Sequence, residues 1–511
     1  MATDGAHTTR PSGADAGRFS VAWAALRRRL SARGLLETVV RGPDAPDAFD
    51  VEHLTADSRE GTPGGAFVAV RGTEADGHAF IADAIEGGAR LVVCEELPEA
   101  ARERFPAVVF ARVTDARKAV AEAAAALYDD PAAALRMVGV TGTNGKTTVA
   151  WLVHHLLDAL GEPTGLLSTI EVRAGDETEG TTLTTPGPIE LQRTLRRMVD
   201  RGCTACAMEV SSHALDQDRV HGLDYEVAVF TNLTVDHLDY HGTPRAYRQA
   251  KKTLFDGLGP DATALYNADD EAGAEMVADT AARTVSFALD RDADIHPTVR
   301  ESTIEGLRLG VEGRERTFRL AGRFNAYNLA AAYGVGRALG YEAGAVLDAL
   351  AETPPVPGRF ETLRAEDGRT VVVDYAHTPD ALDNILRAVR AVMPADATLW
   401  CVFGCGGDRD PSKRRAMGGV AEQLADRVVV TSDNPRTEEP ESILNDIRRG
   451  VSRPAEMRWI VDREAAIAAA AEASAPGDVV VIAGKGHETT QTIGTEKRPF
   501  DDRDIARTYF G

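Results

Sequence analysis

Apolar runs rich in valine and isoleucine alternate with alanine-rich amphipathic stretches along most of the chain. Largely apolar runs of strand length recur at residues 66–70, 135–142, 206–210, 227–233 and 478–484. The stretches between them place apolar residues at helical spacing. Strands that alternate with helices in this way are typical of parallel α/β units. We therefore predict an α/β protein built on parallel sheets.

The chain should contain about three such units, because 511 residues exceed what one hydrophobic core normally holds. A proline just past a long helical stretch marks the first division, and three prolines with a glycine at 351–360 mark the second. We predict a flexible tail at 1–18, an N-terminal α/β substrate domain at 19–134, a central domain with a P-loop ATPase-like parallel sheet at 135–350, and a Rossmann-like C-terminal domain at 351–511.

Composition and charge narrow the class of protein. Hydrophobic residues make up 43% of the chain, which is typical of globular proteins. No run approaches the roughly 18–20 continuous apolar residues of a spanning helix, so we expect no membrane insertion. The net charge of −22 disfavours nucleic acid and anionic membranes as partners. No secretory signal is visible, and we expect a cytoplasmic monomer.

Five cysteines in so long a chain do not form a disulfide framework and indicate a reducing compartment. Cys203 and Cys206 form a C-x-x-C motif, which is compatible with a redox or half-zinc site. They lie in an apolar strand pattern without a second cysteine or histidine pair at metal spacing. We therefore favour buried strand cysteines.

The clearest chemical motif is "GVTGTNGKTT" at 139–148, between a predicted strand and a predicted helix. In a phosphate loop, backbone N–H groups and the helix N-terminus hold a polyphosphate, Lys146 neutralises it, and the Thr147 hydroxyl reaches Mg²⁺. Val140 stands where the strict motif has its first glycine, so an ordinary glycine turn is the alternative. The predicted nucleotide site consists of Gly142, Thr143, Asn144, Gly145, Lys146, Thr147 and Thr148.

Acidic and histidine residues follow two further predicted strands. Glu209 ends one strand, and Asp236, His237, Asp239 and His241 lie just past the next. Singly, each is common on protein surfaces. Taken together, at the ends of strands in one predicted nucleotide-binding sheet, these residues indicate metal and polyphosphate chemistry.

Nine motifs in order, between about residue 57 and the C-terminus, resemble one protein family. They are "GTNGKTT", "EVSSHAL", "TNLTVDHLDYHG", "FNAYNLAAA", "PGRFE", "DYAHTPD", "GCGGDRD", "TSDNPR" and "GKGHE". Together they resemble the Mur ligases of peptidoglycan precursor synthesis. The resemblance implies an ATP-dependent ligase that phosphorylates a carboxylate. An amine then attacks the acyl phosphate, giving an amide, ADP and phosphate.

The resemblance also implies functional residues. Catalysis is implied for Lys146, His237 and Lys251, and Mg²⁺ binding for Thr147, Glu209, His237 and Lys251. Lys251 matches a lysine that the family carbamylates, so N6-carboxylysine is implied there, and carbamylation requires a neutral amine. From the sequence alone, a solvated helix lysine is the alternative. Further ATP contacts are implied at Asn325, Asn328, Arg359, Asp374 and His377.

Helix ends supply competing roles for two residues near the implied nucleotide. Asn325 starts a predicted helix, where capping is the competing role and does not exclude adenine binding. Asp380 follows a proline at another helix start, where helix stabilisation competes with a role beside the nucleotide.

The implied nucleotide-sugar substrate is UDP-N-acetylmuramoyl-L-alanyl-D-glutamate. The family more often has an acidic residue where Gly187 stands, close to the path of this substrate. The implied contacts are Ser58, Thr73, Glu74, Ala75, Thr184, Thr185, Ser211, Gln217 and Arg219.

"DNPR" at 433–436 resembles the motif of family members that add meso-2,6-diaminopimelate. The Arg436 guanidinium is a rigid two-pronged donor suited to a carboxylate, and diaminopimelate differs from lysine by one carboxylate. In isolation, the motif predicts an Asx-Pro turn before a helix. The implied diaminopimelate contacts are Arg409, Asp433, Asn434, Pro435, Arg436, Gly484 and Glu488.

Three alternatives stay open at this point. A family member that adds L-lysine is disfavoured by Arg436. A ligase that adds glutamate to folates shares the phosphate loop but is not expected to carry "DNPR" with "GKGHE". A nucleotide-switched binding protein would hydrolyse ATP slowly, whatever amino acid is present.

Overall fold

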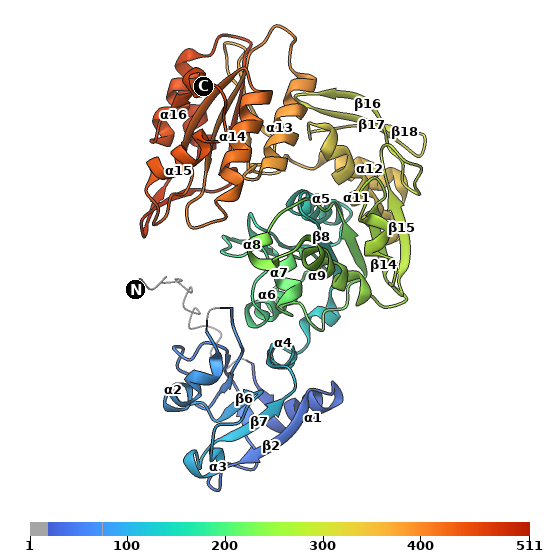
Figure 1. Cartoon of the computed structure of the whole chain (residues 1–511). Helices are drawn as coiled ribbons and strands as arrows, with labels where there is room; N and C mark the ends of the chain where they lie inside the picture. The colour runs from blue at the N-terminus through green and yellow to red at the C-terminus, as the bar shows by residue number, and fades with distance from the viewer. Residues whose placement is uncertain (1–18, 74) are drawn as a thin grey trace.

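The structure is a computed structural model that describes residues 19–73 and 75–511 (Figure 1). The predicted tail at 1–18 lies outside these residues. Three α/β domains follow one another along the chain, coloured from blue through green to red in Figure 1. The predicted fold class of three α/β domains is confirmed. The predicted divisions at 134/135 and 350/351 stay predictions.

The first domain has one five-stranded sheet, in the order β2-β7-β6-β5-β4. Its helices are α1 Trp23–Ala32, α2 Ile81–Glu86, α3 Ala101–Arg104 and α4 Ala116–Leu127, and its strands are β1 Val21–Ala22, β2 Leu36–Arg41, β3 Asp50–Val51, β4 Leu54–Thr55, β5 Ala66–Val68, β6 Leu91–Cys94 and β7 Val109–Val113. The strands β4 to β7 are parallel, and β2 runs antiparallel at the edge. The strand β5 falls on the apolar run predicted at 66–70, and β5 and its neighbour β6 are buried on both faces.

The central domain has an eight-stranded sheet in the order β11-β10-β9-β12-β8-β13-β14-β15. The strands are β8 Arg136–Thr141, β9 Thr164–Leu167, β10 Val172–Ala174, β11 Glu177–Glu179, β12 Ala205–Glu209, β13 Val227–Phe230, β14 Thr263–Asn267 and β15 Arg283–Phe287. The helices are α5 Lys146–Ala159, α6 Pro188–Asp200, α7 Ser212–Asp216, α8 Leu238–His241, α9 Pro244–Asp256, α10 Gly273–Met276, α11 Arg323–Ala338 and α12 Ala343–Glu352. Because β8 lies between β12 and β13, the loop after it occupies the middle of the sheet's carboxyl edge.

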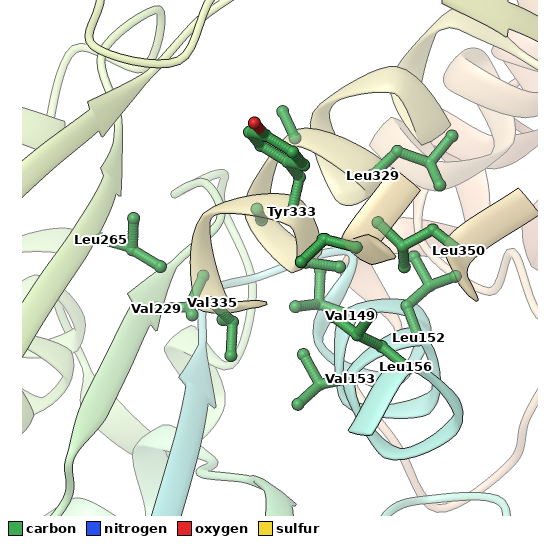
Figure 2. Close-up of a cluster of buried hydrophobic side chains, with 14 of the residues drawn as sticks. Val149, Leu152, Val153, Leu156, Val229, Leu265, Leu329, Tyr333, Val335 and Leu350 are labelled. Carbon is green, nitrogen blue, oxygen red and sulfur yellow. The ribbon is translucent and has the colours of Figure 1, made fainter. Parts of the chain in front are cut away.

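The core of the central domain lies where α5 and α11 pack together on the sheet (Figure 2). Leu152 and Leu156 of α5 contribute to it with Tyr333 of α11, and all three are almost fully buried. The i, i+4 spacing of the two leucines puts them on one helix face. Replacing such a leucine with alanine costs about 2–5 kcal/mol. This packing holds the N-terminus of α5 in place at the end of β8.

The third domain has a six-stranded sheet in the order β19-β20-β24-β21-β22-β23. The strands are β19 Glu361–Arg364, β20 Thr370–Asp374, β21 Leu399–Cys405, β22 Arg427–Ser432, β23 Arg458–Trp459 and β24 Val479–Ala483. The helices are α13 Pro379–Val392, α14 Ser412–Leu424, α15 Pro440–Arg448, α16 Arg463–Ala473 and α17 Asp502–Phe510. All strands except β19 are parallel, so the loops after β20, β22 and β24 share one edge.

Three antiparallel additions were not predicted. The hairpin β10–β11 extends the central sheet, β16 Thr298–Thr303, β17 Gly306–Val311 and β18 Arg314–Phe318 form a separate sheet, and β25 Thr490–Ile493 pairs with β26 Glu496–Pro499. The two hairpins are mostly exposed or half-buried, and β17 interrupts its buried residues with polar ones, so none of these strands has a continuous apolar run. The predicted proline-rich linker at 351–360 begins inside α12, which ends at Glu352.

All five cysteines are buried free thiols. Cys206 lies in β12 and Cys203 just before it, and burial raises the pKa of both thiols. Among the described residues, no group of histidine, cysteine and carboxylate side chains is arranged for a metal. The interpretation as buried cysteines therefore agrees with the structure. Within 19–73 and 75–511, no helix combines the length and apolar character needed to cross a membrane.

Candidate active site

The phosphate loop joins β8 to α5. Gly142 has a φ of 147°, and a Cβ there would lie 1.9 Å from Thr231 Oγ1, so only glycine fits. Asn232 accepts the N–H of Thr143 with its carbonyl oxygen at 2.8 Å and the N–H of Asn144 with Oδ1 at 2.9 Å. The backbone N–H groups of Thr143 and Asn144, which we predicted to bind phosphate, therefore donate to Asn232 in this structure. The first N–H groups of a helix have no intrahelical partner, so the start of α5 is the anion-binding end.

Two lysines converge on one carbonyl oxygen of this loop. Lys146 Nζ donates to the Gly142 oxygen at 3.0 Å, and Lys251 Nζ, from α9, donates to the same oxygen at 2.8 Å. Lys251 is 1% exposed, and its Nζ lies 4.6 Å from the ring centroid of Tyr247. Burial, together with the charge of Lys146, holds the pKa of Lys251 well below the usual lysine value. The alternative of a solvated helix lysine is therefore wrong.

The adjacent Lys252 has the opposite environment. Its Nζ pairs with Asp279 at 2.7 Å and with Asp256 one turn along α9. Burial opposes the charge, but these two hydrogen bonds raise the pKa of Lys252. The environment therefore favours a neutral amine at Lys251 and an ammonium at Lys252.

A buried carboxylate and an arginine of the third domain lie beside the loop. Glu209, at the end of β12, is 1% exposed and accepts from Thr169 N at 2.6 Å and from Thr169 Oγ1 at 3.2 Å. Arg359 Nη2 donates to Thr147 Oγ1 at 3.2 Å. The guanidinium carbon of Arg359 lies 4.3 Å from the ring centroid of Tyr375. The third domain thus reaches the start of α5.

The donors at this position suit Mg²⁺. In nucleotide sites, Mg²⁺ takes one or two carboxylates together with substrate phosphates, and it prefers oxygen. Glu209 and the Thr147 hydroxyl supply this limited oxygen set at the phosphate loop. The residues therefore fit a cation that a nucleotide helps to bind.

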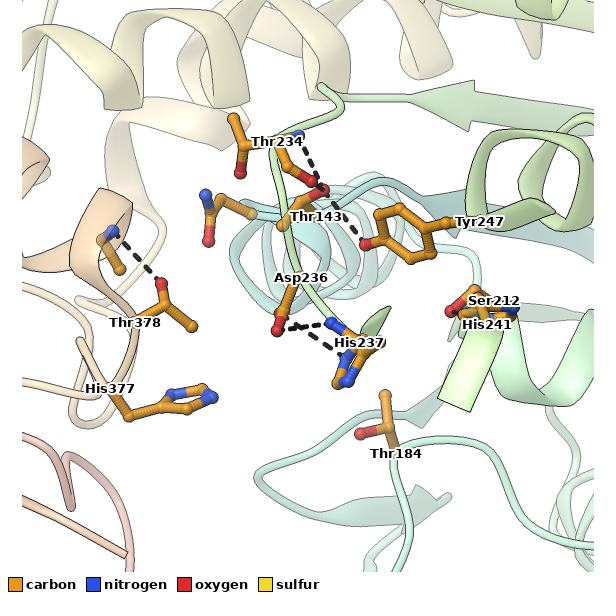
Figure 3. Close-up of polar contacts among 12 residues, drawn as sticks. Thr143, Thr184, Ser212, Thr234, Asp236, His237, His241, Tyr247, His377 and Thr378 are labelled. Carbon is orange, nitrogen blue, oxygen red and sulfur yellow. Dashed lines mark hydrogen bonds and ion pairs between the residues drawn. The ribbon is translucent and has the colours of Figure 1, made fainter. Parts of the chain in front are cut away.

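Histidines gather on the other side of the loop. His237 precedes α8 with a φ of 53°, and its Nε2 lies 3.5 Å from Asp236 Oδ2 (Figure 3). The ring centroid of His213 lies 4.8 Å from that of His237 and 5.5 Å from that of His241. Burial lowers the pKa of His213 to about 4 and also lowers the pKa values of His237 and His241. All three imidazoles are therefore neutral at pH 7 and able to accept a proton or a hydrogen bond.

The two asparagines predicted to contact adenine lie together at the start of α11. Asn328 Nδ2 donates to Asn325 Oδ1 at 2.8 Å, and Asn325 Nδ2 donates to the Ala321 carbonyl oxygen at 2.7 Å. The N-cap of α11 is Gly322, so the capping role considered for Asn325 is wrong. A Cβ on Gly145 would lie 2.5 Å from Asn328 Oδ1. The asparagine pair therefore borders the phosphate loop.

The "DYAHTPD" segment lies at the junction with the central domain. Asp374 Oδ2 accepts the N–H of Phe360 at 2.7 Å, and burial raises the pKa of Asp374. Burial lowers the pKa of His377 to about 4. Asp380 Oδ2 accepts from Asn144 Nδ2 at 2.8 Å, across the domain junction. Asp380 also lies in the first turn of α13, where a carboxylate stabilises a helix start, so the two roles considered for it coexist.

Five residues implied for the nucleotide sugar lie in one cluster of the central domain. Thr185 Oγ1 accepts the N–H of Ser211 at 3.1 Å. Arg219 donates to the Thr185 carbonyl oxygen at 2.8 Å and to Gln217 Oε1 at 2.7 Å. Thr184 precedes Thr185 on the same loop. Hydrogen bonds thus organise a polar surface next to Glu209.

The residues of the first domain that the resemblance implies for the nucleotide sugar are not joined to this cluster by hydrogen bonds among the described residues. Within 19–73 and 75–511, no hydrogen bond joins Ser58, Thr73 or Ala75 to the central-domain cluster. Glu74 lies outside the described residues. A Cβ at Gly187 would meet nothing within 4 Å, so steric demand does not explain this glycine.

The "DNPR" and "GKGHE" segments follow β22 and β24, which flank β21. Asn434 Nδ2 donates to Glu488 Oε2 at 2.8 Å and so joins the two segments. Arg436 has a φ of 50°, and its Nη1 donates at 2.6 Å to a backbone carbonyl oxygen of the loop after β21. A Cβ on Gly484 would lie 2.6 Å from Asp433 Oδ2, so glycine is required there. The structure thus brings the implied amino-acid residues together.

Two details of this site differ from the sequence-based expectation. Glu488, expected to meet a ligand ammonium, accepts from Lys485 Nζ at 2.8 Å. Lys485 lies inside the quoted "GKGHE" motif, but its residue type gives no signal that separates it from a solvated lysine. Arg409 adds a second cation: burial and the charge of Arg409 lower the pKa of Arg436.

His487, also missed, connects the amino-acid site with the carboxylate of the central domain. Its ring centroid lies 5.0 Å from that of Tyr375. Burial lowers the pKa of His487 to about 3, the charge of Arg359 adds to this, and a hydrogen bond to the Thr169 backbone opposes it. Because Thr169 also binds Glu209, one residue links the two sites.

Three family models match the chain in succession. "Mur ligase family, catalytic domain" matches residues 50–135, "Mur ligase middle domain" matches 140–336, and "Mur ligase, glutamate ligase domain" matches 358–486.

Curated relatives match over nearly the whole length. The chain is 45% identical over 460 residues to UDP-N-acetylmuramoyl-L-alanyl-D-glutamate--2,6-diaminopimelate ligase of Cytophaga hutchinsonii, covering 90% of this chain and 94% of the relative. It is 45% identical over 483 residues to the protein of the same name from Chlorobaculum tepidum, covering 92% and 94%.

Solved structures have the same fold. A structure of UDP-N-acetylmuramoyl-L-alanyl-D-glutamate--2,6-diaminopimelate ligase has 33% identity and a TM-score of 0.64, with 90% of this chain and 94% of that chain covered. MurF ligase from Thermotoga maritima in complex with ADP has 21% identity and a TM-score of 0.57, with 84% and 93% covered. On the family models and the full-length relatives, this chain belongs to the Mur ligase family.

Proposed function

We propose that this protein is an ATP-dependent ligase that joins 2,6-diaminopimelate to the D-glutamate carboxylate of UDP-N-acetylmuramoyl-L-alanyl-D-glutamate. Relatives named for this reaction are 41–45% identical over at least 90% of the chain. The choice of amino acid rests on Arg436, whose guanidinium donates to the Gly407 carbonyl oxygen and which shares the "DNPR" segment with Asn434, the partner of Glu488. A guanidinium binds a carboxylate through two hydrogen bonds, and diaminopimelate has the second carboxylate that lysine lacks. We take the meso isomer as the substrate, as "DNPR" implies.

The reaction proceeds through an acyl phosphate. A carboxylate oxygen of the substrate forms a bond to the γ-phosphorus of ATP, and the bond to ADP breaks. The amine of diaminopimelate then attacks the carbonyl carbon and loses a proton, and phosphate leaves. The start of α5 holds the ATP phosphates and Lys146 neutralises them. Arg359, released from the Thr147 hydroxyl, adds positive charge where the transferring group needs it.

A divalent cation fits the same residues. Mg²⁺ would be held by Glu209 and the Thr147 hydroxyl, with His237 and modified Lys251 nearby, and would neutralise charge on the phosphate oxygens. Thr169 fixes both oxygens of Glu209 and so orients this carboxylate before substrate binds.

Modification of Lys251 to N6-carboxylysine is part of this proposal. The neutral amine forms a bond to the carbon of CO₂ and loses a proton, which yields an anionic carbamate. The buried Lys251 amine favours the neutral form that this step requires. The carbamate then lies close to the Lys146 ammonium, and the two opposite charges attract each other.

The acceptor substrate is a precursor linked to a nucleotide, so we place the reaction in the cytoplasm. We also expect a monomer. The net charge of −22 disfavours nucleic acid or an anionic membrane as a partner.

Phosphate release by the purified protein tests the proposal. The assay contains ATP, Mg²⁺ and the UDP-muramoyl dipeptide, with meso-diaminopimelate, L-lysine or neither. We expect release only with diaminopimelate. Release with lysine alone would keep the ligase but overturn the role of Arg436. Phosphate release at the same rate with diaminopimelate, with lysine and with neither would support the nucleotide-switched binding protein instead.

A further inference from the structure

Lys485 is a fully buried cation next to the candidate amino-acid site. Its side chain is 0% exposed. Nζ lies 2.8 Å from Glu488 Oε2, 2.6 Å from the Thr490 carbonyl oxygen and 3.2 Å from Asn434 Oδ1. An ammonium has three N–H donors, so these acceptors can use all of them. A buried lysine is rare unless its charge is paired in this way.

The same contacts fix the orientation of Asn434. Its Oδ1 accepts from Lys485 and from the N–H of Thr492 at 2.9 Å, and its Nδ2 donates to Glu488 Oε2. The acceptor side of the amide is therefore occupied by the protein. Asn434 acts in this site as a connector between two segments.

Glu488 is left with one oxygen for a ligand. Oε2 accepts from both Lys485 and Asn434, whereas Oε1 accepts no hydrogen bond from the part of the chain that the structure describes. The Glu488 side chain is 30% exposed, in contrast to its buried partner. A single carboxylate oxygen is thus presented toward solvent in a set direction.

The hairpin β25–β26 ties Arg436 to this arrangement. Arg436 N donates to the Thr492 carbonyl oxygen at 3.1 Å, and Gly494 N donates to the Arg436 carbonyl oxygen at 2.6 Å. Lys485 binds the first residue of the same hairpin, Thr490. The positions of Glu488 and Arg436 therefore depend on one hydrogen-bonded unit with Lys485 at its centre.

We propose that Lys485 is the positioning residue for amino-acid recognition. It holds Glu488 so that Oε1 meets the incoming ammonium, and through Asn434 and β25 it sets the separation between Glu488 and Arg436. Two groups of one diaminopimelate molecule can then be bound at once without reorganisation of the site. This inference rests on the proposed function and adds a residue to it.

Steady-state kinetics of Lys485→Met test the inference. Methionine has a similar length and no charge, so Glu488 keeps only Asn434 as a donor. We expect the KM for diaminopimelate to rise about tenfold or more, as loss of a charge-assisted hydrogen bond predicts. The KM for ATP should stay unchanged. Lys497→Met, on exposed β26 of the same hairpin, is the matched control and should behave like the wild type.

A double-mutant cycle separates positioning from general support of the fold. If Lys485 acts through Glu488, then Lys485→Met should add little to the loss already seen in Glu488→Gln. Additive losses, an unchanged KM for diaminopimelate, or an equal rise in the KM for ATP would overturn the inference. If Lys485→Met does not fold, Lys485→Gln, which keeps two donors, should show a smaller rise confined to the same KM.

The wild-type control distinguishes the two proposals. Wild-type protein that releases phosphate only with diaminopimelate, together with an unaffected Lys485 variant, would overturn this inference alone. Wild-type protein indifferent to diaminopimelate would overturn the proposed function and this inference with it.

Discussion

The carboxylate of Asp380, on the first turn of α13, accepts a hydrogen bond of 2.8 Å from the side-chain amide of Asn144 in the phosphate loop. The same oxygen accepts from Thr234 Oγ1 at 3.2 Å. Burial raises the pKa of Asp380. The domain that carries the candidate amino-acid site is therefore in direct contact with the loop proposed to bind ATP.

Replacing Asp380 with alanine should loosen this junction. A hydrogen bond to a charged group contributes about 1.5–3 kcal/mol, so we expect the KM for ATP to rise about tenfold or more. Initial rates of phosphate release at varied ATP measure this. Asp383→Ala is the matched control, because Asp383 lies on the same helix and pairs with Arg387 one turn away. An equal rise in the control would show that the contact with Asn144 is irrelevant.

The two adjacent lysines of α9 should respond differently to substitution. Lys251→Ala removes the buried amine beside the phosphate loop, and kcat should fall by about a hundredfold or more, as for loss of a preorganised catalytic group. Lys252→Ala removes ion pairs with Asp256 and Asp279 and should leave kcat near the wild-type value.

Formate provides a second measurement of the carbamate at Lys251. A small carboxylate can enter the space that Lys251→Ala leaves and replace the carbamate oxygens, so added formate should restore part of the activity. The same addition should not affect Lys252→Ala. Full activity of the untreated Lys251→Ala protein would contradict the proposed modification.

Arg436→Lys should impair amino-acid binding selectively. Lysine keeps the positive charge but loses the two-pronged donor, so the KM for diaminopimelate should rise about tenfold while the KM for ATP holds. Arg498→Lys, which affects an exposed pair with Glu496 in β26, is the control. If both KM values rise together, Arg436 is not the partner of the second carboxylate.

The parts of the fold that were predictable are those with continuous apolar runs. Strands β12, β13 and β24 fall on the runs predicted at 206–210, 227–233 and 478–484, because a strand buried on both faces has little polar sequence. The hairpin β25–β26 is exposed along most of its length, so its sequence carries no such signal. Yet this hairpin supports Arg436, and so an unpredicted element shapes the candidate site.

Motifs predicted which residues belong to the site but not how they are connected. The contact between Arg359 and Thr147 joins residues 212 positions apart, and only the packing of two domains creates it. Thr169, His487 and Lys485 were missed for a related reason. Their residue types are common in loops, and their roles come from partners in other segments, such as Glu209 for Thr169 and Asn434 for Lys485.

The first domain contains a buried carboxylate whose charge should stabilise the fold. Glu122 of α4 is 1% exposed and pairs with Arg29 at 2.6 Å and Arg33 at 2.9 Å, while His221 of the central domain lies 3.5 Å away. Burial alone would raise the pKa of Glu122, but the hydrogen bonds from His221 and Arg29 and the charges of both arginines lower it to about 2.

Protonation of Glu122 at low pH should weaken its ion pairs with Arg29 and Arg33. The substitution Glu122→Gln should remove the same stabilisation at neutral pH. Because the folded pKa lies below the ordinary value of 4.5, Glu122 stabilises the fold above about pH 4.5, and the contribution is lost as the pH falls through about 2. At pH 7, the substitution should lower the free energy of unfolding by about 2–3 kcal/mol.

Calorimetric melting of the wild type and Glu122→Gln from pH 7 to pH 2 should show the difference in stability shrinking below about pH 4.5. Glu103→Gln, on the exposed side of α3, should melt like the wild type throughout. A difference between wild type and Glu122→Gln that persists undiminished at pH 2 would mean that packing, rather than the charge of Glu122, stabilises this part of the domain.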